Sequence, residues 1–259
     1  DLGLTRLMGS FEASGVEFRD MGKLASEHPA VQFRYFSDLN EEGAESYPVN
    51  RIEGCSFVNS WNYVIRNEKS FGVQLINNVL HRSFHSAINV DLASYDTVIQ
   101  GNLVSSVLRS PDDYDPACKK DKSCWNKPFA SFFIWNKNFA EISGNVAANS
   151  EDIGFQYYPL DVCNTPLLEA KFRNNEAYGT LVGLFVMDVN VGEGNECRMV
   201  SQFTAWKNAH LGIVTVDQSA NIEVVDVVLS DNHEGISLNF VTKGFNYDNH
   251  AAITQSIIM

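Results

Sequence analysis

The feature that most constrains the fold is a short apolar phrase, broken by Gly, Asn or Ser, that recurs along the chain. The phrases are "IEGCSFVNS", "VQLINNVLH", "TVIQGNLVSS", "EISGNVAANS", "EAKFRNNEAYG", "VSQFTAWKN" and "IEVVDVVLSDN". Successive phrases lie 22, 24, 43, 30, 28 and 24 residues apart when they are aligned on Ser56, Asn78, Asn102, Asn145, Asn175, Phe203 and Val227. A base period of 22 to 24 residues with insertions is typical of a repeat fold.

The pattern inside each repeat indicates strands. Apolar and polar residues alternate with a period of two over short runs, and Gly, Asn and Pro occur too often for helices of ten residues or more. Three short strands and three bends in 22 to 24 residues describe one coil of an all-β, parallel β-helix, in which each coil pairs with the next. A β-sandwich would not explain the fixed period, and a propeller blade needs roughly 40 residues.

The polar hinge of each phrase is explained by the same fold. Asn tolerates the left-handed conformation that a bend requires, and its amide can bond to the same Asn one coil away. We therefore expect structural bends, rather than catalytic groups, at Asn78, Asn102, Asn145 and Asn175. The side chains expected to point inward are Ile142, Val146, Ile153, Phe155, Leu184, Val186, Ile213, Val214, Val216, Ile236 and Leu238.

We expect residues 1–259 to form a single β-helix module, cut from a longer ectodomain, with one loop insertion over 109–128. Cys118 and Cys124 flank "KKDKS" in this insertion and are predicted to close it with a disulfide. Cys163 and Cys197 both lie in polar insertions and could pair with each other. Cys55 is expected to be a small buried thiol. Two loop disulfides would indicate an oxidising compartment.

Charge narrows the classes of partner. The net charge is −13, and no Lys/Arg stripe is present, which argues against nucleic acid as a partner. No apolar run approaches the roughly 18 residues that cross a bilayer, so we expect no direct membrane contact by this segment. Protein partners in a surface assembly or flanking domains of the same chain, and glycans, remain as candidates.

Several phrases resemble those of the family with G8 domains and PbH1 repeats, which includes fibrocystin, fibrocystin-L and the cell-migration-inducing and transmembrane hyaluronan-degrading proteins. "EISGNVAANSEDIGFQYY" is similar to the family's "N-x-A-A-G-S-E-x-x-G-F" coil, and "GVEFRDMG" to its "G-V-E-x-x-x-M-G" coil. "AKFRNNEAYGTLVGLFV", "FTAWKNAHLGIVTV" and "VVLSDNHEGISL" resemble the coils that follow. The ordered match covers most of residues 10 to 240.

The resemblance implies a right-handed parallel β-helix in the extracellular part of a secreted or membrane-anchored surface protein. Within the family, the fibrocystin branch is associated with cilia and other surface projections. The hyaluronan-degrading branch carries "Y-P-I-H-F-H", and aligning its Pro on Pro29 of "HPAVQFRY" puts its two His positions at Val31 and Phe33. The candidate acid/base or metal-binding histidines are therefore replaced, although His28 and Arg34 lie nearby.

Other residues of the sequence are candidates for catalysis or metal binding. His81 and His85 in "HRSFHS" have metal-ligand spacing only on a helix, and the segment is predicted to be strand and turn. Stacked acid or base candidates for a polysaccharide lyase or hydrolase are Arg66, Asp91, Asp188 and Asp217, each at the end of an apolar strand where a turn residue is common. The loop "SPDDYDP" could bind calcium through Asp112, Asp113 and Asp115 but lacks the Gly and distal Glu of an EF-hand.

Two functions follow from these observations. One is a non-catalytic structural or recognition module at the cell surface, with no catalytic residue, metal or cofactor. The alternative is an extracellular glycan-degrading enzyme of the hyaluronidase or polysaccharide-lyase type. The replaced histidines, the acidic charge and the absence of a carboxylate–base cluster in the sequence favour the first.

Overall fold

Short strands separated by tight bends fill the described part of the chain, in a computed structural model. The described residues are 10–23, 28–34, 50–91, 93–109, 129–135, 139–159, 161–187, 197–218, 221–240 and 251–259. Within these ranges, no helix is long and apolar enough to cross a membrane. The predicted insertion at 109–128 therefore lies, except for its first residue, outside the described residues.

Successive strands wind into coils, and each of the first six coils adds one strand to each of three parallel sheets. In spatial order the first sheet is β1 (Glu12–Ser14), β4 (Asn50–Glu53), β7 (Val73–Ile76), β10 (Val98–Gln100), β13 (Glu141–Ser143) and β16 (Phe172–Arg173). The second sheet is β2 (Glu17–Arg19), β5 (Ser56–Ser60), β8 (Val79–Phe84), β11 (Leu103–Leu108), β14 (Val146–Ala148), β17 (Asn175–Tyr178), β20 (Phe203–Trp206), β23 (Val228–Ser230) and β26 (Ile257–Ile258).

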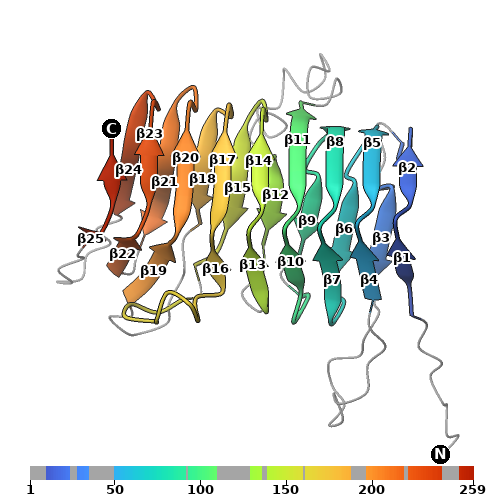
Figure 1. Ribbon diagram of the computed structural model, residues 1–259, viewed down its shortest axis with the longest axis horizontal. Helices are drawn as coiled ribbons and strands as arrows, with labels where there is room; N and C mark the ends of the chain where they lie inside the picture. Colours follow the sequence, from blue (N-terminus) through green and yellow to red (C-terminus); the bar gives the residue numbers. More distant parts are fainter. Residues whose placement is uncertain are drawn as a thin grey trace, which may run out of the picture.

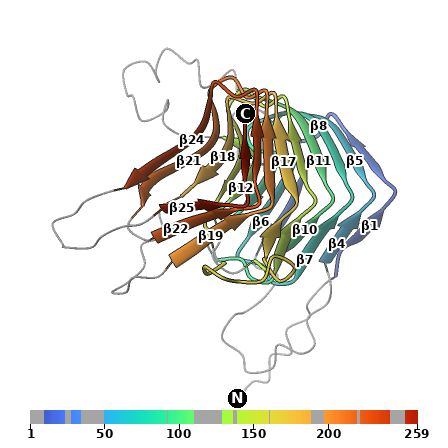
Figure 2. The ribbon, with the colours of Figure 1, turned by 60° about the vertical axis from the view of Figure 1, so that its left-hand side comes forward.

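The third sheet is β3 (Val31–Arg34), β6 (Ile65–Glu68), β9 (Ile88–Val90), β12 (Ala130–Ile134), β15 (Ile153–Tyr157), β18 (Val182–Val186), β21 (Leu211–Gln218) and β24 (Glu234–Phe240). A fourth sheet, β19 (Cys197–Ser201), β22 (Asn221–Val225) and β25 (Ala251–Thr254), follows β16 along the solenoid. Figures 1 and 2 show the strands stacked along one long axis. The predicted all-β parallel β-helix is confirmed.

The strand register tests the repeat alignment residue by residue. Asn175 pairs with Phe203. Leu103 pairs with Val146, which places the preceding residues, Asn102 and Asn145, opposite each other. Only the first reference point is displaced, because Ser56 pairs with Val79 and so Cys55 is the true equivalent of Asn78. Cys55 occupies the Asn position of its coil, and the missing amide explains the one-residue error.

Bends between the sheets use left-handed residues. At the bend from the first to the second sheet, φ is between 49° and 65° at Gly15, Gly54, Asn77, Gly101, Gly144, Asn174, Gln202, Asp226 and Gln255. Each lies immediately before the hinge position of its coil. The prediction that the hinge Asn itself takes the left-handed conformation is therefore wrong, because the preceding Gly, Asn, Gln or Asp does so.

Inward side chains form one continuous apolar core along the axis. Of the predicted inward residues, Ile142, Phe155, Leu184, Val186 and Ile213 are buried in this core, and Ile236 and Leu238 pack against it. Aromatic rings fill its middle. Those of Phe132 and Phe155 stack at 4.4 Å, and those of Tyr157 and Phe172 at 4.2 Å.

Four of the predicted inward residues need correction or lie outside the described residues. Val146 is only half-buried and Ala147 takes the core position, because the inward-pointing Asn145 sets the alternation one residue earlier. Ile153 and Val214 are buried, but in a separate cluster with Ala130, Val182 and Leu211. The side chain of Val216 lies outside the described residues.

A column of glycines runs through the third sheet. Gly154, Gly183, Gly212 and Gly235 occupy the same position in β15, β18, β21 and β24. A Cβ at Gly183 would lie 2.6 Å from the Gly212 carbonyl oxygen, and a Cβ at Gly154 would lie 2.7 Å from that of Gly183. The coils can stack this closely only because these side chains are absent.

Candidate functional site

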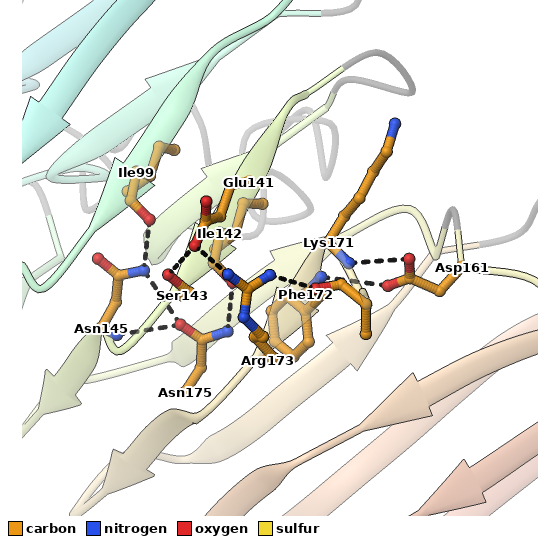
Figure 3. A network of polar contacts seen from close by, with 11 residues as sticks. Ile99, Glu141, Ile142, Ser143, Asn145, Asp161, Lys171, Phe172, Arg173 and Asn175 are labelled. Atoms are coloured by element: carbon orange, nitrogen blue, oxygen red, sulfur yellow. Dashed lines mark hydrogen bonds and ion pairs between the residues drawn. The ribbon is translucent and has the colours of Figure 1, made fainter. Parts of the chain in front are cut away.

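The hinge asparagines lie in the interior and form a ladder of amide hydrogen bonds. The Nδ2 of Asn78 donates to Oδ1 of Asn102, Asn102 donates likewise to Asn145, and Asn145 to Asn175, at 2.9 to 3.0 Å. Figure 3 shows the step from Asn145 to Asn175. All four asparagines are at most 1% exposed.

Each ladder amide also satisfies the backbone of neighbouring coils. The Oδ1 of Asn145 accepts the backbone N–H of Asn102 at 3.0 Å, and its Nδ2 donates to the Ile99 carbonyl at 2.8 Å. The same arrangement holds at Asn102, whose Nδ2 donates to the Leu75 carbonyl at 2.8 Å. Since the amides complete hydrogen bonds that the bend leaves unmade, they are committed to the fold and not to a reaction.

The outer face of the third sheet carries a charged cluster, which we call the Glu68 cluster: Gln32, Arg34, Arg66 and Glu68. The Glu68 carboxylate accepts from Nε2 of Gln32 at 3.1 Å and faces Nε of Arg34 at 3.5 Å and of Arg66 at 3.8 Å. The Glu68 side chain is 14% exposed and that of Arg34 55% exposed. Arg66 also lies over the Tyr63 ring, 5.7 Å from its centre.

The pleat of β3 determines which of its side chains reach this face. Phe33 is 1% exposed in the core, and Val31 packs against the core on the same side. The alignment that placed the family's two His positions at Val31 and Phe33 therefore selects inward residues, where no side chain could meet a substrate. Gln32 and Arg34 are the outward pair, and moving the alignment by one residue places the apolar Phe of "H-F-H" on Phe33.

The Glu68 cluster has the chemistry of a binding surface. One carboxylate is shared by two guanidinium groups, so the cluster has a formal charge of +1 and a planar donor set. A glycosidase of the common type requires two carboxyl groups facing each other across the bond that is cleaved. Asp91 does not supply the second one, because its Oδ1 accepts from the Lys69 and Ala93 amides and from the Ser94 hydroxyl.

The two histidines examined as metal ligands are separated by the fold. His81 is exposed on β8 of the second sheet, and its Nδ1 lies 2.9 Å from Oγ of Ser105. His85 has φ of 73° at the following bend and stacks on the Tyr63 ring at 5.3 Å. Across the described ranges, no group of three or more His, Cys, Asp or Glu residues could hold a metal ion.

Several predicted positions lie outside the described residues. They are Asp188, the side chain of Asp217, the calcium candidates Asp112, Asp113 and Asp115, and the Cys118/Cys124 pair. Of the two stacked acid or base candidates whose side chains are described, Arg66 joins a charged cluster and Asp91 does not.

Cys163 and Cys197 are joined by a disulfide with a Cα–Cα distance of 5.3 Å. The bond links the excursion after β15 to the start of β19, where the fourth sheet begins. Nearby, buried Asp161 accepts the backbone N–H groups of Lys171 and Phe172 at 2.9 and 3.1 Å (Figure 3). Cys55 is a buried free thiol, as its apolar surroundings predict.

Sequence reasoning missed a second ladder at the bend between the second and third sheets. Thr180 Oγ1 donates to Oδ1 of Asn208 at 2.6 Å, and Asn208 Nδ2 donates to Oδ1 of Asn232 at 2.8 Å. The signal was present as a polar residue directly after the left-handed residues Gly179, Lys207 and Asp231. The second ladder begins in the coil of Asn175, where the first ladder ends.

The resemblance phrase "NVAANSEDIGF" is largely explained by packing. Asn145 belongs to the ladder, Ala147 is buried against the core, Gly154 belongs to the glycine column, and Phe155 fills the core. Asn149, with φ of 54°, occupies the place of the family's Gly. Five of the phrase's positions are thus needed for the coil itself.

The acidic pair of that phrase lies at the base of the predicted insertion. The Glu151 carboxylate accepts the backbone N–H of Arg109 at 2.7 Å, and the Arg109 guanidinium lies 3.9 Å from Asp152. Burial raises the pKa of the Asp152 carboxyl, and the Arg109 charge and the Phe129 amide offset only part of this effect. Sequence reasoning did not single out Asp152, because no local pattern reports its burial.

Comparisons with known proteins agree with this geometry. No curated protein matches the sequence at a significant level. The family model "CEMIP beta-helix" matches residues 3–198, which include the Glu68 cluster and the four-Asn ladder. The relation to the cell-migration-inducing proteins is thereby supported, and the chain belongs to the CEMIP beta-helix family.

Proposed function

We propose that the chain is a non-catalytic structural and recognition module in the extracellular part of a cell-surface or secreted protein. The observation that carries this proposal is the state of the Glu68 cluster. Its carboxylate accepts a hydrogen bond from Gln32 and forms ion pairs with Arg34 and Arg66, which fixes these charges on the outer face of β3 and β6. The amide ladder adds stiffness, because it links each coil to the next through buried hydrogen bonds.

The disulfide and the family membership are compatible with an extracellular or cell-surface location. Within the family, we place the chain nearer the fibrocystin branch, including its surface-projection role, than the hyaluronan-degrading branch. The support is that β3 presents Gln32 and Arg34 outward, where the hyaluronan-degrading phrase has two histidines. We propose protein partners in a surface assembly, with a glycan as a further candidate.

A depolymerisation assay on hyaluronan and on pectin-type chains tests the proposal. We expect no change in chain length, measured by size-exclusion chromatography with light scattering, over a range of pH and with calcium added. Clear turnover would overturn the non-catalytic reading.

One specific observation keeps the enzymatic alternative testable. Arg66 lies over the Tyr63 ring and shares the Glu68 carboxylate with Arg34, and this surface with a net positive charge suits a uronate-containing glycan. If turnover occurs, Glu68→Gln and Arg34→Gln distinguish the sources. Loss of turnover in both variants would assign the activity to the Glu68 cluster, and unchanged turnover would assign it to another part of the chain.

A further inference from the structure

A small hollow lies on the outer surface where β5 and β8 end. It has a volume of about 60 Å³ and is lined by Asn59, Trp61, Arg82 and Phe84. The Trp61 and Phe84 rings come from adjacent coils and stack at 5.7 Å with an angle of 15° between their planes. Trp61 is 44% exposed, so a large ring faces solvent beside the hollow.

A second ring pair continues the first along the same two coils. Tyr63 and His85 stack at 5.3 Å, two residues after Trp61 and one residue after Phe84. We call these four residues the aromatic strip. Exposed aromatic residues are enriched at protein interfaces, because their large rings bury much area at a small cost in conformational entropy.

Arg82 gives the hollow a charge. It is exposed, with φ of 59°, and no described residue forms an ion pair or hydrogen bond with its guanidinium. Arg34 and Arg66, in contrast, share the carboxylate of Glu68. Within the described residues, the Arg82 guanidinium shares no carboxylate in this way and lies beside the two rings of the hollow.

We propose that the hollow docks a protein segment that places one apolar side chain against the Trp61 and Phe84 rings and an adjacent Asp or Glu on Arg82. The ring-lined hollow suits an apolar side chain, which gives up no hydrogen bonds to water when it enters. The guanidinium suits a carboxylate, which it binds with two parallel hydrogen bonds. Trp, Tyr and Arg are also the residue types enriched at the energetic centres of protein interfaces.

The acidity of the whole chain does not prevent this contact. At physiological ionic strength, exposed charges more than about 8 Å apart are largely screened, so the local guanidinium determines the electrostatics of the hollow. The inference rests on the proposed recognition role and names its surface and the chemistry of its partner. It is independent of the depolymerisation assay, because turnover and peptide docking are separate measurements.

Selection of displayed random peptides on the intact chain tests the proposal, with counter-selection on the Trp61→Ala variant. We expect the enriched peptides to share an apolar residue next to Asp or Glu. A synthetic peptide of the enriched sequence is then titrated by fluorescence anisotropy. We expect Trp61→Ala and Arg82→Gln each to raise the Kd by about tenfold or more.

Lys207→Gln is the matched control. Like Arg82, Lys207 has positive φ and lies beside an aromatic ring, here that of Trp206 at 5.4 Å. The variant therefore removes one charge beside one ring elsewhere on the same sheet. Its Kd should equal that of the wild type. Replacing the acid of the peptide by its amide should remove the difference between wild type and Arg82→Gln.

Three results would overturn the proposal. The selection could yield no peptide whose binding depends on Trp61, or the enriched peptides could lack an acid and bind Arg82→Gln as well as wild type. The third is displacement of the peptides by neutral or hyaluronan oligosaccharides whose own binding requires Trp61. The last result would assign the surface to a glycan. Circular dichroism melting of each variant verifies that a loss of binding is not a loss of fold.

Discussion

At the scale of single residues, the buried asparagines act as extensions of the backbone. Each bend removes a residue from the sheet ladder, and a side-chain amide supplies the donor and acceptor that the next coil lacks. Where the amide is absent, as at Cys55, the neighbouring Asn78 still accepts the Cys55 N–H at 2.9 Å. The ladder therefore depends on each Asn for both of its neighbours.

Asn102→Ala is the sharpest test of this dependence. The substitution leaves the Asn78 N–H and the Leu75 carbonyl without their partners, so we expect a loss of about 2 kcal/mol or more in the free energy of unfolding. Urea denaturation followed by tryptophan fluorescence measures it. Asn77→Gly, at an exposed left-handed position, should change stability by less than about 0.5 kcal/mol. Equal effects of the two variants would contradict a special role for the ladder.

Asp152 makes a prediction about pH. The pKa of its carboxyl is raised in the folded state, so at pH values between the unfolded and folded pKa the folded state binds more protons than the unfolded state. The contribution of this group to the free energy of unfolding therefore rises as pH falls through that window. Asp152→Asn removes the titration. We expect the stability of Asp152→Asn relative to wild type to be greatest at neutral pH and to shrink as pH falls towards about 4, near the pKa of an unfolded Asp. Urea denaturation at each pH measures the difference, and a difference that grows as pH falls would contradict this prediction.

At the scale of elements, four strands of the third sheet depend on the absence of a side chain at one shared position. β15, β18, β21 and β24 carry Gly at the same position, and each would meet the next coil if it had a Cβ. The spacing of stacked coils leaves no freedom to move apart at one point without breaking strand pairing. The column therefore sets how closely the second and third sheets approach.

Gly183→Ala tests the column without a conformational penalty, since Gly183 does not have positive φ. Its Cβ would lie 2.6 Å from the Gly212 oxygen, and we expect a loss of about 1 to 3 kcal/mol in the free energy of unfolding. Gly72→Ala is the comparison, because a Cβ there meets no atom within 4 Å and only its φ of 67° opposes it. A smaller loss at Gly183 than at Gly72 would show that the column is not tightly packed.

The elements also show how far the sequence leads. The coil length was predictable because Asn recurs at one position, and the glycine column was visible as "IGF", "VGL", "LGI" and "EGI". The outward direction of Arg34 was not predictable. A short matched phrase does not show which side chains of a strand point inward until one of them, here Phe33, is known to be buried. The Glu68 cluster was hidden as well, since Gln32 and Glu68 are 36 residues apart and meet only through strand register.

At the scale of the whole molecule, the solenoid is a one-dimensional stack in which each coil contacts only its neighbours. Stability in such a stack is the sum of coil and interface terms, so a weak step separates the parts on either side of it. The step from β16 to β19 is such a place, because the first sheet ends there and the fourth begins. The Cys163–Cys197 disulfide lies across this step.

Removing the disulfide should therefore loosen one end of the stack and leave the other intact. In a Cys163→Ser/Cys197→Ser double variant, we expect amide hydrogen exchange in β22 to accelerate by about tenfold or more, since disulfide loss typically costs 2 to 5 kcal/mol. Exchange in β7, on the far side of the Asn ladder, should be unchanged. The double variant is preferable to a reductant, which would also act on the remaining cysteines. Equal acceleration in β7 and β22 would mean that the solenoid unfolds as one unit and that the step from β16 to β19 is as strong as any other.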